Sequence, residues 1–246
     1  MASHPVPGGK FLSQGLVILY EDRDLLVVDK PPGLLTIATE TENRRTAYFI
    51  LTDYVRKGAS KSRNRVFIVH RLDREASGVL VFAKNEPAKL RLQKDWEQTK
   101  KLYLAVVHGQ CKKTEDVISS CLAENRAHVV YATSDPAKGK LSRTAYRVLA
   151  EGNGRTLLEV DLLTGRKHQI RVHLAGMGNP IVGDAKYGKP ERAPARLALH
   201  ARSLSFNHPH NGRRLTFESR IPAYLKALVG GKAVFARPLP KPRQPT

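Results

Sequence analysis

The chain has 246 residues, of which 41% are hydrophobic and 26% are charged, the composition of a globular protein with a sizeable core. Its 42 lysines and arginines outnumber 22 aspartates and glutamates, which leaves a formal net charge of +20 and favours a polyanionic partner over a generally basic surface. No apolar run approaches the ~20 residues of a membrane helix, and two cysteines are too few for a disulfide framework, so we expect a cytoplasmic protein with reduced thiols and no membrane contact.

The first half of the chain alternates apolar runs with polar turns. Residues 1–15 carry no such pattern and are expected to form a loose arm. Two strands are predicted within Leu16–Asp29, ending at Lys-Pro-Pro because proline cannot donate to a strand ladder. A helix is predicted after Thr46, a suitable N-cap, and a buried strand over Gly78–Ala83. Asn85 is the expected cap of a further helix that runs to about Gln98.

The second half contributes two more clear strands and one helix. The segments Leu102–His108 and Thr156–Leu163 have strand patterns, and His168–Met177 suits a short helix that stops at a glycine. A long surface loop is expected over Gly183–Arg196, which is rich in glycine, proline and charge. The last ten residues, 237–246, contain four prolines and are expected to form a flexible tail.

The predicted strands outnumber the helices and do not alternate strictly with them, which disfavours a doubly wound parallel sheet. We therefore expect an α+β fold with a mixed, largely antiparallel sheet flanked by helices and loops. Residues 16–236 are expected to form one domain, since no repeat or low-complexity segment divides them.

Common cofactor and metal signatures are missing from the sequence. It contains no G-x-x-x-x-G-K-[ST] phosphate loop, and its two Gly-x-Gly pairs lack the third glycine of a dinucleotide site. His168 and His173 would point about 140° apart on a helix, which is poor geometry for sharing a metal. No cofactor and no metal site are expected.

Two segments concentrate groups that could carry chemistry. His70–Gly78 (HRLDREASG) places Asp73 between two arginines in a turn before a buried strand, where nearby cations favour its ionised form. Leu163–Leu174 (LTGRKHQIRVHL) gathers cations and a histidine where a strand passes into a helix, a site suited to anions. Taken locally, Asp73 is equally well a surface ion-pair partner, and the basic cluster a solvated helix start.

Three long motifs resemble those of the RluA-type RNA pseudouridine synthases, in the same order along the chain. HRLDREASGVLVFAK is similar to the H-R-L-D-x-x-T-S-G motif of that family, and LLTGRKHQIRVHLAGMGNPIVGDAKYG to its later motif, which includes G-D-x-x-Y-G. The opening VILYEDRDLLVVDKPPGLL resembles the first motif. The resemblance covers residues 16 to 225 and implies the pseudouridine synthase catalytic fold.

The chain departs from the family pattern at three places. Ala76 stands where the family commonly has threonine, and Thr36-Ile37-Ala38 stands where a Val-His pair is usual. Only about fifteen residues precede the first motif, so the S4-type RNA-binding domain of many relatives is not expected. None of these departures involves the aspartate itself.

The resemblance implies isomerisation of uridine to pseudouridine within RNA, with no cofactor. The position that matches the essential aspartate is Asp73, which would act as nucleophile or as base. Arg171 matches the arginine that pairs with it, and Tyr103 matches the tyrosine that would stack on the uracil or take part in proton transfer.

Five further residues are assigned to RNA contacts on the same resemblance. The target base must be flipped out of its stack. Arg71 is expected to enter the vacated space or to hold the displaced strand. Arg166, Lys167 and His168 are expected to position phosphates, and Leu174 to line the uracil pocket.

Two alternatives remain open on the sequence alone. A non-catalytic RNA-binding or folding module would share the charge and the motifs, although it has no need of the Asp73, Tyr103 and Arg171 trio. A small-molecule hydrolase using Asp73 or Ser77 leaves the +20 charge unexplained. Ribosomal and transfer RNA are both compatible substrates, and a monomer is expected because no amphipathic heptad is evident.

Overall fold

The computed structural model describes residues 9–59, 61–188 and 196–230, and within these ranges twelve strands form one continuous sheet. The strands are β1 (Lys10–Phe11), β2 (Val17–Glu21), β3 (Leu25–Lys30), β4 (Phe67–Ile68), β5 (Ser77–Ala83), β6 (Lys100–His108), β7 (Glu115–Glu124), β8 (Val130–Thr133), β9 (Lys140–Gly152), β10 (Arg155–Leu162), β11 (Leu199–Asn207) and β12 (Arg214–Glu218). The helices are α1 (Ala47–Arg56), α2 (Glu86–Lys94), α3 (Gln169–Gly176) and α4 (Ala223–Leu228), with 3-10 turns at Ser13–Gly15 and Trp96–Gln98.

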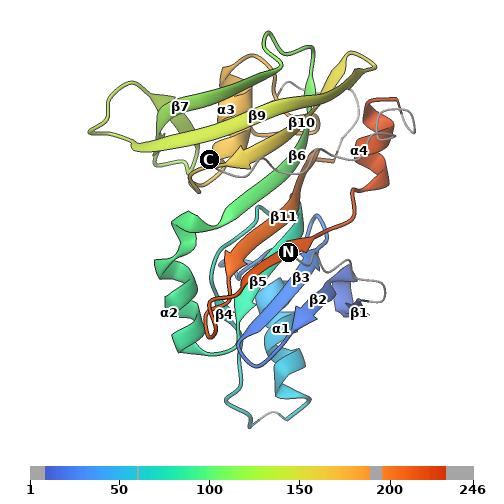
Figure 1. Ribbon diagram of the computed structural model, residues 1–246, viewed down its shortest axis with the longest axis vertical. Coiled ribbons are helices and arrows are strands. Elements are labelled where there is room, and N and C mark those ends of the chain that lie inside the picture. The colour runs from blue at the N-terminus through green and yellow to red at the C-terminus, as the bar shows by residue number, and fades with distance from the viewer. Residues whose placement is uncertain (1–8, 60, 189–195, 231–246) are drawn as a thin grey trace.

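The strand order is β1-β2-β3-β5-β11-β6-β10-β9-β7-β8, with β12 added beside β11 and β4 beside β5. Every pair is antiparallel except β5 and β11, which run parallel. The predicted α+β fold with a mixed, largely antiparallel sheet is confirmed. Figure 1 shows the sheet running the length of the molecule, so that β5 from the first half of the chain meets β11 from the last part in its middle.

Strands β3 and β5 are buried on both faces, which explains their nearly continuous apolar sequences. Alternate residues of the two strands pack into one core with α1, and the intervening residues pack into a second core with α2. The first set is Leu26, Val28, Leu80 and Phe82; the second is Leu25, Val27, Val79 and Val81. Helices α1 and α2 therefore cover opposite faces of this part of the sheet.

The two predicted helix caps are confirmed. The Thr46 hydroxyl accepts the Phe49 N–H at 3.0 Å at the start of α1, and the Asn85 side chain accepts the Ala88 N–H at 2.9 Å at the start of α2. Helix α2 ends at Lys94 and a 3-10 turn continues to the predicted end. No helix in the described part of the chain has the length and apolar character of a bilayer span.

The predicted N-terminal arm is wrong for its second half. Residues 10–11 form β1, which pairs antiparallel with β2, and a 3-10 turn over Ser13–Gly15 connects the two strands. Both residues of β1 are exposed, so the sequence has no pattern of buried apolar residues that would predict a strand there. The strand forms because the free backbone edge of β2 hydrogen-bonds to it. The first half of the arm (1–8) and the predicted tail (237–246) lie outside the described residues.

Strands β7, β8 and β9 were not predicted. Their residues are largely exposed or half-buried, so the apolar alternation that marks a strand in sequence is weak. They form because each supplies backbone partners to the next, as β9 pairs with both β10 and β7. Strands β7 and β9 lie with α3 and β10 in the upper half of the molecule (Figure 1).

Two buried histidines make the fold sensitive to acid. His173 and His200 are each 2% exposed, and burial lowers the pKa of His173 to about 4 and that of His200 to about 3. In the unfolded chain each histidine binds a proton near pH 6.5, whereas in the folded protein it stays neutral to a lower pH. The unfolding free energy that the two neutral histidines contribute is therefore complete above pH 6.5 and is lost as the pH falls toward 4. Denaturant unfolding should show a loss of about 2 kcal/mol per histidine between pH 7 and pH 5.

The replacement His173→Gln should remove about half of the pH dependence of the unfolding free energy that is assigned to His173 and His200 together. His128→Gln, at a side chain that is 82% exposed, provides the matched control for replacing a buried histidine. An equal slope in His173→Gln and the unmodified protein would contradict the assignment.

Candidate active site

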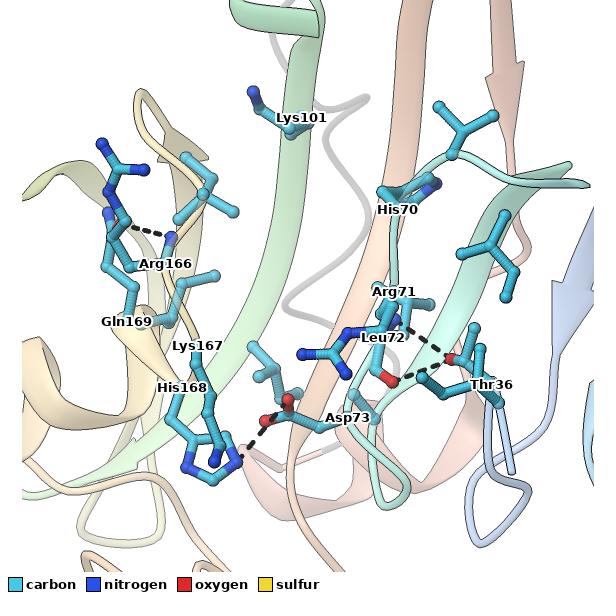
Figure 2. A pocket seen from close by; sticks show the side chains of 18 of the residues that line it. Thr36, His70, Arg71, Leu72, Asp73, Lys101, Arg166, Lys167, His168 and Gln169 are labelled. Carbon is cyan, nitrogen blue, oxygen red and sulfur yellow. Dashed lines mark hydrogen bonds and ion pairs between the residues drawn. The ribbon is translucent and has the colours of Figure 1, made fainter. Parts of the chain in front are cut away.

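A cavity of about 630 Å³ opens where loops from distant parts of the chain meet the middle of the sheet. Its walls come from residues 35–39, from the loop between β4 and β5, from β6, and from the turn between β10 and α3. Most of its charged lining is positive: Arg71, Lys101, Arg166, Lys167 and Arg171, with Asp73 as the carboxylate among them. Figure 2 shows Asp73 and His168 at one end of this space and Lys101 at the other.

Asp73 lies in the loop that leads into β5, and hydrogen bonds on both sides hold that loop. On one side the Thr36 hydroxyl donates to the Leu72 carbonyl at 2.9 Å and accepts the Leu72 N–H at 3.2 Å (Figure 2). On the other side the buried Lys30 ammonium donates to the carbonyl of Arg74 at 3.1 Å. The backbone of the residue before and of the residue after Asp73 is therefore fixed.

Lys30 is fully buried and holds two more carbonyls, those of Pro31 and Leu34, at 2.9 and 2.8 Å. Burial lowers its pKa to about 7, against the opposing charges of Glu75 and Asp73. The Lys-Pro sequence at the end of β3 thus ties that strand to the loop that carries Asp73.

Gly78 is required where this loop enters β5. Its φ is +114°, and a Cβ atom there would lie 2.1 Å from the Ala201 carbonyl oxygen on the parallel strand β11. No side chain fits such an approach, so only glycine lets the two backbones come together directly after the Asp73 loop.

Arg171, in the first turn of α3, joins two carboxylates. Its Nη1 donates to Asp73 Oδ2 at 3.0 Å, while Nε and Nη2 donate to the two oxygens of Asp184 at 2.9 and 2.8 Å. Burial disfavours the charged guanidinium, but the hydrogen bonds and charge of Asp184, and then of Asp73, outweigh it and raise the pKa of Arg171. The fork from Asp184 fixes the plane of the guanidinium and so aims Nη1 at Asp73.

Asp184 is a site residue to which the sequence analysis gave no role. It falls within the predicted surface loop Gly183–Arg196, yet it is only 3% exposed, so the loop prediction is wrong at this position. Its Oδ1 also accepts the N–H groups of Lys186 and Tyr187 at 2.9 and 3.0 Å. Burial acts to raise the pKa of Asp184, but Arg171 and these two N–H groups hold it below its usual range.

The surrounding Gly-Asp-x-x-Tyr-Gly run was the available signal for Asp184. Gly188 donates its N–H to the Asp184 carbonyl at 2.8 Å, and a Cβ atom on Gly188 would lie 2.3 Å from that oxygen. The tight turn therefore requires a glycine, and Tyr187 in the same turn extends to His168. Residues 189–195 of the predicted loop lie outside the described part of the chain.

His168 precedes α3 in the left-handed backbone region, with φ +53°, which is uncommon for a residue that is not glycine. Its Nδ1 hydrogen-bonds the Tyr187 hydroxyl at 2.7 Å, and its Nε2 lies 3.9 Å from Asp73 Oδ1 (Figure 2). Burial lowers the pKa of His168, Asp73 opposes this, and Arg171 adds to it. His168 is therefore neutral at pH 7 and faces Asp73.

Gln169 was another residue missed by the sequence analysis, and it orders the turn between β10 and α3. Its Oε1 accepts from the Thr164 hydroxyl and the Arg166 N–H at 2.8 and 3.0 Å. Its Nε2 donates at 2.9 Å to the Arg143 carbonyl and to the Thr144 hydroxyl on β9. The basic turn is thus attached to the sheet rather than freely solvated.

Tyr103 lies in the middle of the sheet on β6, between β10 and β11, and lines the cavity. Its side chain is buried, and burial, followed by the charge of Asp73, raises its pKa well above the usual range. The hydroxyl is therefore protonated at neutral pH. Within the described residues it makes no hydrogen bond, which leaves it available to a molecule in the cavity.

The other predicted contact residues have different surroundings. Arg71 and Arg166 are exposed and line the cavity. Lys167 lines it as well, but its ammonium forms an ion pair with Glu124 of β7. Leu174 requires a correction: it is fully buried in the main core and does not line the cavity. It lies one helical turn, about 6 Å, beyond Ile170, which does line it.

Removing the Thr36 hydroxyl should affect catalysis through Asp73. Thr36→Val keeps the shape of the side chain but leaves the Leu72 N–H and carbonyl without partners, at a cost of about 2 kcal/mol in unfolding free energy. We expect kcat to fall about tenfold, a barrier change of about 1.4 kcal/mol, with KM nearly unchanged. Steady-state kinetics and denaturant unfolding check both values.

Thr36→Ser should restore most of the lost kcat, and Thr41→Val, at an exposed threonine nearby, serves as control. If Thr36→Val is destabilised while the folded enzyme keeps its full kcat, the hydroxyl stabilises the loop without positioning Asp73.

Among the described residues, no three histidine, cysteine, aspartate or glutamate side chains gather as metal ligands. The arrangement instead offers a carboxylate beside an aligned guanidinium, a neutral imidazole and a protonated phenol, around a space with a positive rim.

Residues 24–176 match the family model described as RNA pseudouridylate synthase. The chain is 36% identical over 225 residues to the ribosomal large subunit pseudouridine synthase D of Nitrosomonas europaea. This match covers 87% of this chain but only 64% of the length of that protein. It is 36% identical over 213 residues to the dual-specificity RNA pseudouridine synthase RluA of Escherichia coli, covering 83% of this chain and 92% of that one. Among solved structures, the human RNA pseudouridylate synthase domain containing 1 matches with a TM-score of 0.71 at 28% identity, over 91% of this chain and 90% of that one.

Proposed function

The chain belongs to the RNA pseudouridine synthase family, and from this premise we propose that it isomerises uridine to pseudouridine in ribosomal or transfer RNA with Asp73 as its essential carboxylate. The observation that carries the assignment of Asp73 is its ion pair with the buried Arg171, at 3.0 Å, at the edge of the cavity.

The isomerisation exchanges one bond to the ribose for another. The N1–C1′ bond breaks, the uracil turns within the cavity, and a C5–C1′ bond forms. C5 loses a proton and N1 gains one, so atoms and electrons balance without a redox partner or a donated group. Asp73 serves as nucleophile at the ribose or as base.

Arg171 is proposed to orient the Asp73 carboxylate before the reaction. Its guanidinium is held in plane by Asp184, so the contact to Asp73 requires no rearrangement when RNA binds. His168, neutral and 3.9 Å from the same carboxylate, is placed to accept or return a proton beside Asp73.

Tyr103 is proposed to bind the flipped uracil. Its ring offers a stacking surface, and its protonated hydroxyl is a hydrogen-bond donor at neutral pH. The hydroxyl has no partner among the described residues, so a uracil carbonyl would satisfy it.

Arg71 and Arg166, exposed at the rim, are proposed to bind the RNA strand that surrounds the flipped base. Lys167 would have to exchange its contact with Glu124 for a phosphate, so we expect it to contribute less. The net charge of +20 supports broad phosphate contact. A cytoplasmic monomer remains our proposal for its location and assembly.

The test is to map pseudouridine in total RNA from cells that lack the gene, before and after incubation with the purified protein. Carbodiimide-dependent stops of reverse transcription mark each pseudouridine. New stops would establish the activity and identify the RNA and the position. Tight, salt-sensitive RNA binding without any new stop would instead favour a non-catalytic binding module, which none of the relatives described above supports.

A further inference from the structure

Lys101 lines the cavity at the end away from Asp73 (Figure 2). It lies two residues before Tyr103 on β6, so both side chains project from the same face of the strand, about 6.6 Å apart along it. Lys101 is only 6% exposed. Within the described residues its ammonium has no hydrogen bond and no ion pair. Burial lowers the pKa of Lys101, against the opposing charges of Asp161 and Glu97.

Three neighbouring cations differ from Lys101 in having carboxylate partners, whereas Arg71 and Arg166 at the rim are exposed to solvent. Lys100 pairs with Asp161 at 3.7 Å, Lys167 pairs with Glu124, and Arg171 is held between two aspartates. A buried ammonium without a partner is costly, and an anion that enters the cavity would remove that cost.

An aromatic wall lies beside this ammonium. The rings of Trp96 and His70 are 4.5 Å apart and tilted by 33°, and Lys101 Nζ is 5.9 Å from the Trp96 ring centre. The Val81 N–H donates to His70 Nε2 at 3.2 Å, which fixes the imidazole as an acceptor and therefore as neutral. A cation next to an aromatic surface is the combination that binds single-stranded nucleotides, through phosphate and base.

We propose that this end of the cavity is a second nucleotide subsite, in which Lys101 binds the phosphate and Trp96 the base of the nucleotide that neighbours the target uridine. The inference rests on the proposed function, since it assumes that Tyr103 receives the uracil. The distance of about 6.6 Å along β6 between Lys101 and Tyr103 brings the subsite within reach of the next nucleotide on the same RNA strand.

The first experiment compares RNA binding by Lys101→Met and Lys100→Met. Both remove one positive charge from adjacent positions of β6 and keep a long side chain, but Lys100 does not line the cavity. The probe is a short single-stranded oligouridylate, and its Kd is measured over a range of salt concentrations. For Lys101→Met we expect Kd to rise about tenfold, the effect of one charged hydrogen bond, and the salt slope to fall by about 0.7. Lys100→Met should change Kd less than about threefold.

The second experiment locates the contact on the RNA. A neutral methylphosphonate placed beside one uridine should weaken binding to the unmodified protein about as much as Lys101→Met does, and should weaken binding to Lys101→Met no further. An abasic nucleotide at the same place should weaken binding to the unmodified protein about as much as Trp96→Leu does, and should weaken binding to Trp96→Leu no further.

Two outcomes would overturn the subsite: equal effects of the two lysine variants, or additive losses from Lys101→Met and the methylphosphonate. Both outcomes would assign Lys101 to the fold or to the general charge. Because these are binding measurements, they are independent of turnover. If Lys101→Met selectively loses RNA binding but the protein forms no pseudouridine in any RNA, the proposed function is overturned and the subsite is retained. If the protein forms pseudouridine but Lys101→Met shows no selective loss of binding, the subsite is overturned and the proposed function is retained.

Discussion

Replacing Asp73 by asparagine is expected to abolish pseudouridine formation, with a fall in single-turnover rate of at least about 10³-fold. Asparagine has the same shape as aspartate, and its amide oxygen can still accept from Arg171 Nη1, so the loop should keep its structure. The amide has neither the negative charge nor the basicity that the reaction at C1′ needs. Release of tritium from C5 of the target uridine follows the reaction directly, since C5 loses its proton when it joins C1′.

RNA affinity should change less than about threefold in the same variant, because binding depends on the phosphate contacts around the cavity. Asp135→Asn is a suitable control, since Asp135 forms an exposed ion pair with Lys138 at 3.2 Å, and its rate should remain unchanged. Retained turnover in Asp73→Asn would refute the proposed role, and lost RNA affinity would place Asp73 in binding rather than in chemistry.

The second large effect is expected from Asp184→Asn. Asp184 and Arg171 form a buried ion pair with side chains 1% and 7% exposed, and removing one charge of such a pair leaves the other uncompensated. Arg171 would keep Asp73 as a partner, so we expect a loss of about 3 kcal/mol in unfolding free energy, the lower end of the usual range. The rate should fall about 100-fold as well, because the guanidinium loses the fork that aims it at Asp73.

Glu218→Gln provides the matched control for this substitution. Arg202 and Glu218 form a 2.7 Å ion pair with the carboxylate side chain 46% exposed, so its loss should cost no more than about 1 kcal/mol and leave the rate unchanged. Denaturant unfolding and single-turnover kinetics measure both effects. An Asp184→Asn protein that is destabilised but fully active when folded would show that Asp184 supports the fold without orienting Arg171.

The proposed roles divide the cavity by function. At one end a negative carboxylate is held between positive or neutral groups, which suits chemistry at the ribose. At the other end the Lys101 ammonium, which has no carboxylate partner among the described residues, lies beside the rings of Trp96 and His70 and suits the flanking RNA strand. Tyr103 lies between them on β6, where the uracil would have to turn. The substrate would therefore be held on both sides of the bond that breaks.

Much of the local structure could be predicted because its causes are close together in sequence. Thr46 and Asn85 each cap a helix through an N–H three residues away, and the apolar runs of β3 and β5 reflect burial on both faces. Asp73, Tyr103 and Arg171 were named from motifs, since each stands in a distinctive run of residues. The isomerase activity followed from the same motifs and agrees with the named relatives.

The partners of those residues were decided only by the tertiary structure. Asp73 and Arg171 are 98 positions apart, and Thr36 and Leu72 are 36 apart, so no local pattern fixes their distances. Leu174 was assigned to the cavity from its motif, but the direction of α3 carries it into the core.

Asp184 shows the same limit most clearly. In sequence it belongs to a polar, glycine-rich segment typical of a surface loop, yet the fold buries it against Arg171. A buried carboxylate is stable only where a cation and N–H groups surround it, and those arise from α3 and from its own turn. Sequence determines which groups are present and the short-range bonds among them, whereas long-range packing determines which charges meet, because that depends on how the whole sheet assembles.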